Sequence, residues 1–154
     1  MQQYDEAIDE AQKSLELNSD FPVGLYVLGA AYAAKGMYKE AIAAHQRVYT
    51  VSPRWRFALG ITYALTGRRD EALEVAAELE AEPKTWDTLF LAQIYSVLGE
   101  KDEAFRWLEE AYEEPHHPYM PWFVRMIAFE PLRDDPRFKD LLQRMNLPQL
   151  DESP

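Results

Sequence analysis

The sequence predicts an all-α fold of antiparallel helical hairpins. A short phrase that ends in Glu-Ala recurs four times, and its alanines stand 34, 31 and 32 residues apart. In the last three copies a glycine stands five residues ahead of the alanine, with apolar residues at helical spacing on both sides of it. The alanines are Ala7, Ala41, Ala72 and Ala104, and the glycines are Gly36, Gly67 and Gly99. Self-similarity at this spacing indicates a repeat of two helices.

The glycines are expected to end the first helix of each hairpin. Glycine adopts the left-handed conformation of a helix C-cap without the steric cost that other residues incur. Acidic residues then stand where the second helix begins, and they complement the positive end of its dipole. These residues are Glu40, Asp70, Glu71, Asp102 and Glu103.

The repeat register divides what we expect to be a single domain into segments. Residues 1–20 are expected to form the second helix of a partial repeat, and three complete repeats to span 21–53, 54–83 and 84–117. Residues 118–148 are expected to form a nonrepeat helical cap, and 149–154 a disordered tail. In the cap, Asp135 followed by Pro136 is a typical helix start. The half repeat at the beginning suggests a fragment of a longer protein.

Composition excludes several classes of function. Hydrophobic residues make up 47% of the chain and charged residues 28%, which is typical of a folded domain. The absence of cysteine excludes disulfides and a thiol nucleophile. No signal peptide or membrane span is visible, so we expect a cytoplasmic protein. The net charge of −11 disfavours nucleic acid and anionic membranes as partners.

The repeat resembles the tetratricopeptide pattern W-x2-L-G-x2-Y, A-x3-F, P. The first complete copy matches the pattern at Leu25, Leu28, Gly29, Tyr32, Ala41, His45 and Pro53. The resemblance implies a right-handed superhelix of hairpins, and His45 then takes the place of a packing aromatic. Residues 129–148 resemble the ending of many bacterial tetratricopeptide proteins, in which the repeats follow signalling or regulatory domains.

Residues that carry chemistry are scarce in this sequence. His116 and His117, with Glu113 and Glu114, are the one candidate for a metal-dependent hydrolase. Adjacent histidines point in different directions, however, so a solvated loop is the favoured interpretation. No glycine-rich phosphate loop is present. We therefore expect no enzyme activity, no catalytic residue, no metal and no cofactor.

The resemblance also implies a binding surface, because the first helix of each hairpin lines the concave face in this family. The expected groove consists of Tyr26, Arg54, Phe57, Ile61, Trp86, Phe90 and Gln93. Its apolar and aromatic character favours an apolar or amphipathic peptide or helix. Some family members bind acidic peptide C-termini with a clamp of several cations and asparagines. Here Arg54 is the one cation of the groove, so such a clamp is not expected.

Several alternatives stay open at this stage. The apolar run of residues 119–129 can fold back on the last hairpin and cover part of the surface at Trp86 and Phe90. The chain can act as an adaptor, which is the favoured hypothesis, or associate with itself through the half repeat or this apolar run. It can also be the regulatory module of a larger signalling protein.

Overall fold

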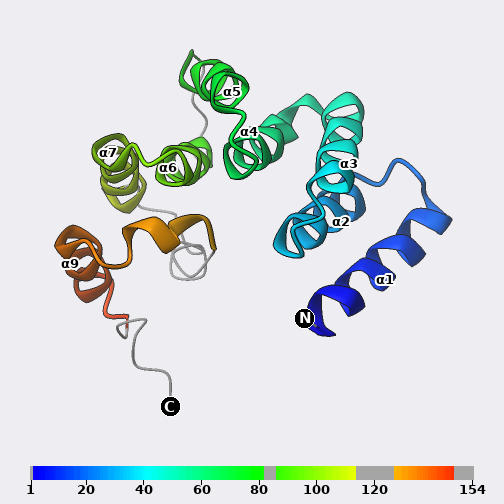
Figure 1. Ribbon diagram of the computed structural model, residues 1–154, viewed down its shortest axis with the longest axis horizontal. Coiled ribbons are helices and arrows are strands. Elements are labelled where there is room, and N and C mark those ends of the chain that lie inside the picture. The colour runs from blue at the N-terminus through cyan, green and yellow to red at the C-terminus, as the bar shows by residue number, and fades with distance from the viewer. Residues whose placement is uncertain (1, 82–85, 114–126, 148–154) are drawn as a thin grey trace. The chain divides into compact units, whose positions relative to one another are not determined.

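The computed structural model of the chain describes residues 2–81, 86–113 and 127–147, and all regular secondary structure in these ranges is helical (Figure 1). This confirms the predicted all-α fold class. The handedness of the superhelix stays a prediction. The chain divides into two compact units, Met1–Val75 (unit 1) and Ala76–Pro154 (unit 2).

Unit 1 contains two and a half hairpins. Its helices are α1 (Gln2–Leu17), α2 (Pro22–Ala34), α3 (Tyr38–Val51), the 3-10 turn η1 (Pro53–Trp55), α4 (Arg56–Leu65) and the first half of α5 (Arg69–Ala81). Helix α2 packs against α3, α1 packs against α2, and α4 packs against α3. The order of contacts therefore follows the order of the chain, as expected of a stacked repeat.

Helix α1 buries one face against its neighbour and exposes the other. Ile8 is 9% and Ala11 4% exposed. The opposite face is polar, and its exposed residues are Asp5, Glu6, Asp9, Glu10, Gln12, Lys13 and Glu16.

The turns between the helices confirm the predicted glycine caps. Gly36 and Gly67 have φ of 73° and Gly99 has φ of 79°, all in the left-handed region. In each turn the residue after the glycine donates its backbone N–H to a tyrosine carbonyl four residues before the glycine, at 2.9 Å. The tyrosines are Tyr32, Tyr63 and Tyr95. This is the Schellman arrangement, which satisfies the last carbonyls of a helix.

Unit 2 contains one hairpin and a C-terminal segment. Its elements are the second half of α5, α6 (Asp87–Val97), α7 (Lys101–Glu113), the 3-10 helix η2 (Ile127–Leu132) and α9 (Pro136–Arg144). Helix α6 packs against α7, and η2 packs against α6. The hydrophobic core of this unit includes Leu91, Ile94, Leu108, Phe129 and Phe138, each at most 1% exposed.

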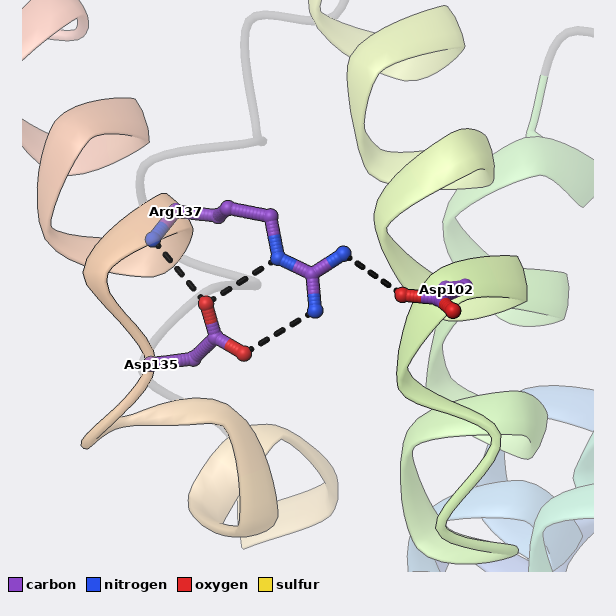
Figure 2. A network of polar contacts seen from close by, with 3 residues as sticks. All are labelled: Asp102, Asp135 and Arg137. Carbon is purple, nitrogen blue, oxygen red and sulfur yellow. Dashed lines mark hydrogen bonds and ion pairs between the residues drawn. The ribbon is translucent and has the colours of Figure 1, made fainter.

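Polar contacts hold α9 beside α7 (Figure 2). Asp135 caps α9 by accepting the backbone N–H of Arg137 at 3.0 Å, and its carboxylate also accepts from the Arg137 guanidinium at 3.0 Å. The same guanidinium reaches Asp102 at the start of α7, at 2.8 Å. These hydrogen bonds from Arg137 lower the pKa of the Asp135 carboxyl.

The two helices run in the same direction. A second ion pair joins Arg144, at the end of α9, to Glu109 of α7. Both pairs connect residues 35 positions apart, so the start of α9 lies beside the start of α7 and the end beside the end. Within the described ranges, none of these helices combines the length and the apolar character needed to span a membrane.

Candidate functional site

Three aromatic rings from three elements of unit 1 meet in one cluster. The Tyr26 ring of α2 lies 5.0 Å from the Trp55 ring of η1 and 5.7 Å from the Phe57 ring of α4, measured between centroids. The rings of Trp55 and Phe57 are 5.7 Å apart. Contacts at these distances stabilise beyond the burial of apolar area. Tyr26 and Trp55 remain partly exposed, so the cluster forms a surface.

Two hydrogen-bond donors at this cluster have no acceptor within the described ranges. Arg54 is exposed, and its guanidinium lies 5.9 Å from the centroid of the Trp55 ring without an ion pair to a described carboxylate. The Tyr26 hydroxyl makes no hydrogen bond with a described residue. Burial raises the pKa of Tyr26, so this hydroxyl keeps its proton and remains a donor.

The local sequence explains how Trp55 reaches the cluster. Ser52 is extended, with φ of −150°, and ends α3. Pro53 cannot continue that helix and opens η1, which is closed by a hydrogen bond from Trp55 N–H to the Ser52 carbonyl at 3.0 Å. The repeat register placed Trp55 in the first helix of the repeat 54–83 but outside its expected concave face, so Trp55 was not among the predicted groove residues. An aromatic residue directly after Pro53-Arg54 was the signal available.

A buried histidine lies beneath Tyr26 and links three helices. His45 of α3 is 3% exposed, its Nδ1 lies 2.8 Å from Thr62 Oγ1 of α4, and its Nε2 lies 3.3 Å from the Tyr26 carbonyl of α2. Burial lowers the pKa of His45 to about 4. The imidazole also fills the space left by Gly29, where an added Cβ would lie 2.3 Å from it. The predicted packing role of His45 is confirmed.

The predicted groove residues fall into two sets. Tyr26, Arg54, Phe57 and Ile61 belong to unit 1, and Trp86, Phe90 and Gln93 belong to unit 2. Trp86 is 41% exposed, whereas Phe57 is 6%, Phe90 8% and Gln93 1% exposed. Ile61 is half-buried. Contact with a partner stays a prediction for all seven, and the exposed part of the set consists of Tyr26, Arg54, Ile61 and Trp86.

In unit 2 the 3-10 helix η2 packs against α6, the helix that follows Trp86. Ser96 of α6 donates its hydroxyl to the Ala128 carbonyl of η2 at 2.6 Å. Ala128 is 3% and Phe129 0% exposed. Residues 127–129 of the apolar run therefore lie against α6, and coverage of the surface at Trp86 and Phe90 by this run stays a prediction. The rest of that run, like His116 and His117, falls outside the described residues.

Within residues 2–81, 86–113 and 127–147, no three histidine or carboxylate side chains gather in a way that could hold a metal ion. Two models of tetratricopeptide repeats match the sequence, one over residues 25–54 and the other over residues 53–78. No curated protein shows significant similarity to the chain. The two matched ranges cover α2 to α5, which include the aromatic cluster and His45.

Proposed function

We propose that residues 25–78, which match models of tetratricopeptide repeats, form a scaffold that binds an apolar or amphipathic segment of another protein. Repeats of this family generally mediate protein–protein interaction, and they are typically not enzymes. The proposed contact surface on unit 1 consists of Tyr26, Arg54, Trp55, Phe57 and Ile61.

The observation that carries the proposal is an aromatic surface with two donors that have no acceptor among the described residues. Tyrosine, tryptophan and arginine are the residues that most often dominate binding energy at protein interfaces. The rings offer apolar contact, whereas the Arg54 guanidinium and the Tyr26 hydroxyl call for acceptors. A guanidinium binds a carboxylate more strongly than a neutral acceptor. A partner segment that combines large apolar side chains with an acidic side chain would therefore match both the rings and the two donors.

The buried residues of the predicted groove have a different part in this proposal. Phe57 packs under Tyr26 and Trp55 and fixes the position of both rings. On unit 2, Phe90 and Gln93 belong to the buried face of α6, and Trp86 presents the exposed ring. We therefore expect direct contact at the exposed residues and support from the buried ones.

Selection from a library of random 16-residue peptides tests the proposal. The peptides are displayed with their C-termini fused to the carrier, so that none offers a terminal carboxylate. The full chain is compared with its Trp55→Ala and Arg54→Glu variants, and circular dichroism verifies that the helices persist. Lys39→Glu is the matched control for Arg54→Glu, because it makes the same change of charge on an exposed residue at the opposite end of α3.

We expect the chain to select peptides that combine large apolar side chains with Asp or Glu. Both surface variants should weaken binding of the selected peptides by about tenfold or more, since a loss of about 1.4 kcal/mol is tenfold. The Lys39→Glu variant should bind as the unmodified chain does. Failure to enrich any peptide, or equal binding by all four proteins, would refute the proposed function. Light scattering at several concentrations separates peptide binding from self-association of the chain.

A further inference from the structure

A chain of polar contacts runs beneath the aromatic surface of unit 1 and joins three helices. His45 Nδ1 of α3 lies 2.8 Å from Thr62 Oγ1 of α4, and that hydroxyl lies 2.8 Å from the Ala58 carbonyl. On the other side of the imidazole, His45 Nε2 lies 3.3 Å from the Tyr26 carbonyl of α2. His45 is 3% and Thr62 1% exposed, so these groups depend on one another for their hydrogen bonds.

The number of protons in this chain of contacts is limited. Burial lowers the pKa of His45 to about 4, so the imidazole is neutral at pH 7 and has a single N–H. The Tyr26 carbonyl can only accept a hydrogen bond, so the nitrogen that faces it must carry that proton. Nδ1 is then an acceptor, and the Thr62 hydroxyl donates to it. The neutral ring therefore has a partner at both nitrogens only when the proton is on Nε2.

The opposite placement of the proton would leave a buried group unsatisfied. With the proton on Nδ1, the lone pair of Nε2 would face the Tyr26 carbonyl oxygen, and two acceptors would meet without a hydrogen between them. The Ala58 carbonyl loses little when the Thr62 hydroxyl turns to His45, because it lies inside α4 and accepts from the helix backbone. The Thr62 hydroxyl thus determines which nitrogen of the ring is protonated.

His45 holds Tyr26 at two points. Its Nε2 faces the Tyr26 carbonyl, and its ring is stacked against the Tyr26 ring, with centroids 5.9 Å apart and an angle of 24° between the planes. The same Tyr26 ring contacts Trp55 and Phe57 in the aromatic cluster. Thr62 is buried out of reach of a partner, and His45 connects it to this surface.

We infer that Thr62 and His45 are positioning residues of the proposed contact surface: the Thr62 hydroxyl donates to Nδ1 and keeps the imidazole proton on Nε2, and this N–H fixes Tyr26 through its backbone carbonyl. This inference rests on the proposed function and deepens it, because it extends the binding site to two buried residues that the partner does not touch. A substitution of Thr62 should therefore change partner binding although this residue lies outside the contact surface.

The position of the proton is measured first, without a ligand. Long-range proton–nitrogen NMR spectra of the full chain labelled with 15N-histidine distinguish a protonated from a bare ring nitrogen, and the His45 signals are those absent from His45→Phe. At pH 7 we expect a protonated Nε2 and a bare Nδ1. Thr62→Val keeps the shape of the side chain and removes its donor, so part of the population should then carry the proton on Nδ1. A protonated Nδ1 in the unmodified chain, or unchanged signals in Thr62→Val, would overturn the inference.

Binding of the peptides selected from the library is then compared among matched variants, with the folded fraction of each taken from urea unfolding. Thr62→Val should weaken binding by about threefold to tenfold, the factor that corresponds to the net contribution of one hydrogen bond. Thr62→Ser retains a hydroxyl and should restore binding. Thr66→Val is the matched control and should bind as the unmodified chain does. It removes a hydroxyl at the end of the same helix, where that group donates to the carbonyls of Thr62 and Tyr63.

Equal binding by Thr62→Val and the unmodified chain would contradict the inference, and so would a loss in Thr62→Ser or Thr66→Val as large as that in Thr62→Val. Failure of the proposed function gives a different result. If no library peptide binds, the proposed function and the inference are both refuted. If peptides bind and depend on Trp55 and Arg54 but not on Thr62, the scaffold is supported and only the inference is refuted.

Discussion

At the scale of single residues, the contact between Gly29 and His45 determines how closely α2 and α3 approach. A Cβ on residue 29 would lie 2.3 Å from the His45 imidazole, and that ring is held on its other side by Thr62. Because three helices fix the ring, it cannot move aside as a surface side chain would. The small residue required by the repeat pattern at this position is thus explained by one specific neighbour.

Gly29→Ala tests this contact, because the contact should decide whether the substitution raises or lowers the free energy of unfolding. In an unhindered helix interior, alanine is more stable than glycine by about 1 kcal/mol. Here the overpacking should cost about 1 to 3 kcal/mol and outweigh the gain in propensity. In a His45→Ala background, the ring is gone and the same substitution should become neutral or stabilising. Urea unfolding of the four proteins gives the comparison, and an unchanged penalty in that background would rule out the imidazole as the cause.

His45 also makes the stability of the chain depend on pH. Burial, the largest influence, lowers its pKa from 6.5 to about 4, although hydrogen bonds to the carbonyls of Tyr26 and Ala58 act in the opposite direction. The folded state therefore binds the proton less tightly than the unfolded state does. The stabilisation is complete above pH 6.5 and is lost as the pH falls toward 4.

Between pH 7 and pH 4.5 this one group should remove about 2 to 3 kcal/mol from the free energy of unfolding. The matched control is His45→Phe, which restores the aromatic residue of the repeat pattern and does not titrate. Carboxylates contribute equally to both proteins, so the difference between their urea midpoints at the two pH values isolates His45. Parallel pH profiles for the two proteins would contradict the assignment.

At the scale of helices, most of the fold could be predicted from local signals. The three glycine caps and the acidic helix starts depend on residues close in sequence, and the structure confirms the caps with φ values of 73°, 73° and 79°. The position of Trp55 and the coverage of α6 by η2 could not be predicted in this way. The coverage of α6 depends on a contact between residues 32 positions apart, Ser96 and Ala128. The position of Trp55 depends on η1, an element that the repeat pattern does not describe.

The C-terminal segment shows how a repeat can lose its sequence signature and keep its arrangement. Asp135, Phe138 and Leu141 of α9 stand 33 residues after Asp102, Phe105 and Leu108 of α7. The two helices run in the same direction, and η2, which precedes α9, packs against α6, which precedes α7. Pro136 in place of glutamate and a first helix reduced to η2 obscured this similarity in the sequence.

Phe138 should anchor α9 to the rest of unit 2. It is 1% exposed, and its ring lies 6.3 Å from the ring of Phe129. Phe138→Ala should destabilise unit 2 by about 3 to 5 kcal/mol through lost burial and the cavity left behind. Gln143→Ala, at an exposed position of the same helix, should have almost no effect. Hydrogen exchange of the α9 amides reports the difference, and equal protection in the two variants would show that α9 docks by other contacts.

For the whole molecule, the division into two compact units has a consequence for cooperativity. In stacked repeats each element contacts its neighbours in sequence, so a local defect need not spread through the chain. The boundary after Val75 falls within α5, at a point that the repeat pattern does not mark. Sequence spacing predicted the hairpins within a single domain and contained no signal for the boundary inside α5.

Two matched core substitutions measure how independent the units are. Leu108 of unit 2 and Val48 of unit 1 are both 0% exposed. Leu108→Ala should cost about 2 to 5 kcal/mol, and the loss should appear as faster amide exchange in α6 and α7 with smaller changes in α2 and α3. Val48→Ala should give the opposite pattern. If either substitution accelerates exchange to the same extent in both hairpins, the chain unfolds as a single cooperative unit. A ligand that binds α2 would then stabilise the hairpin of α6 and α7 as strongly as the hairpin of α2 and α3.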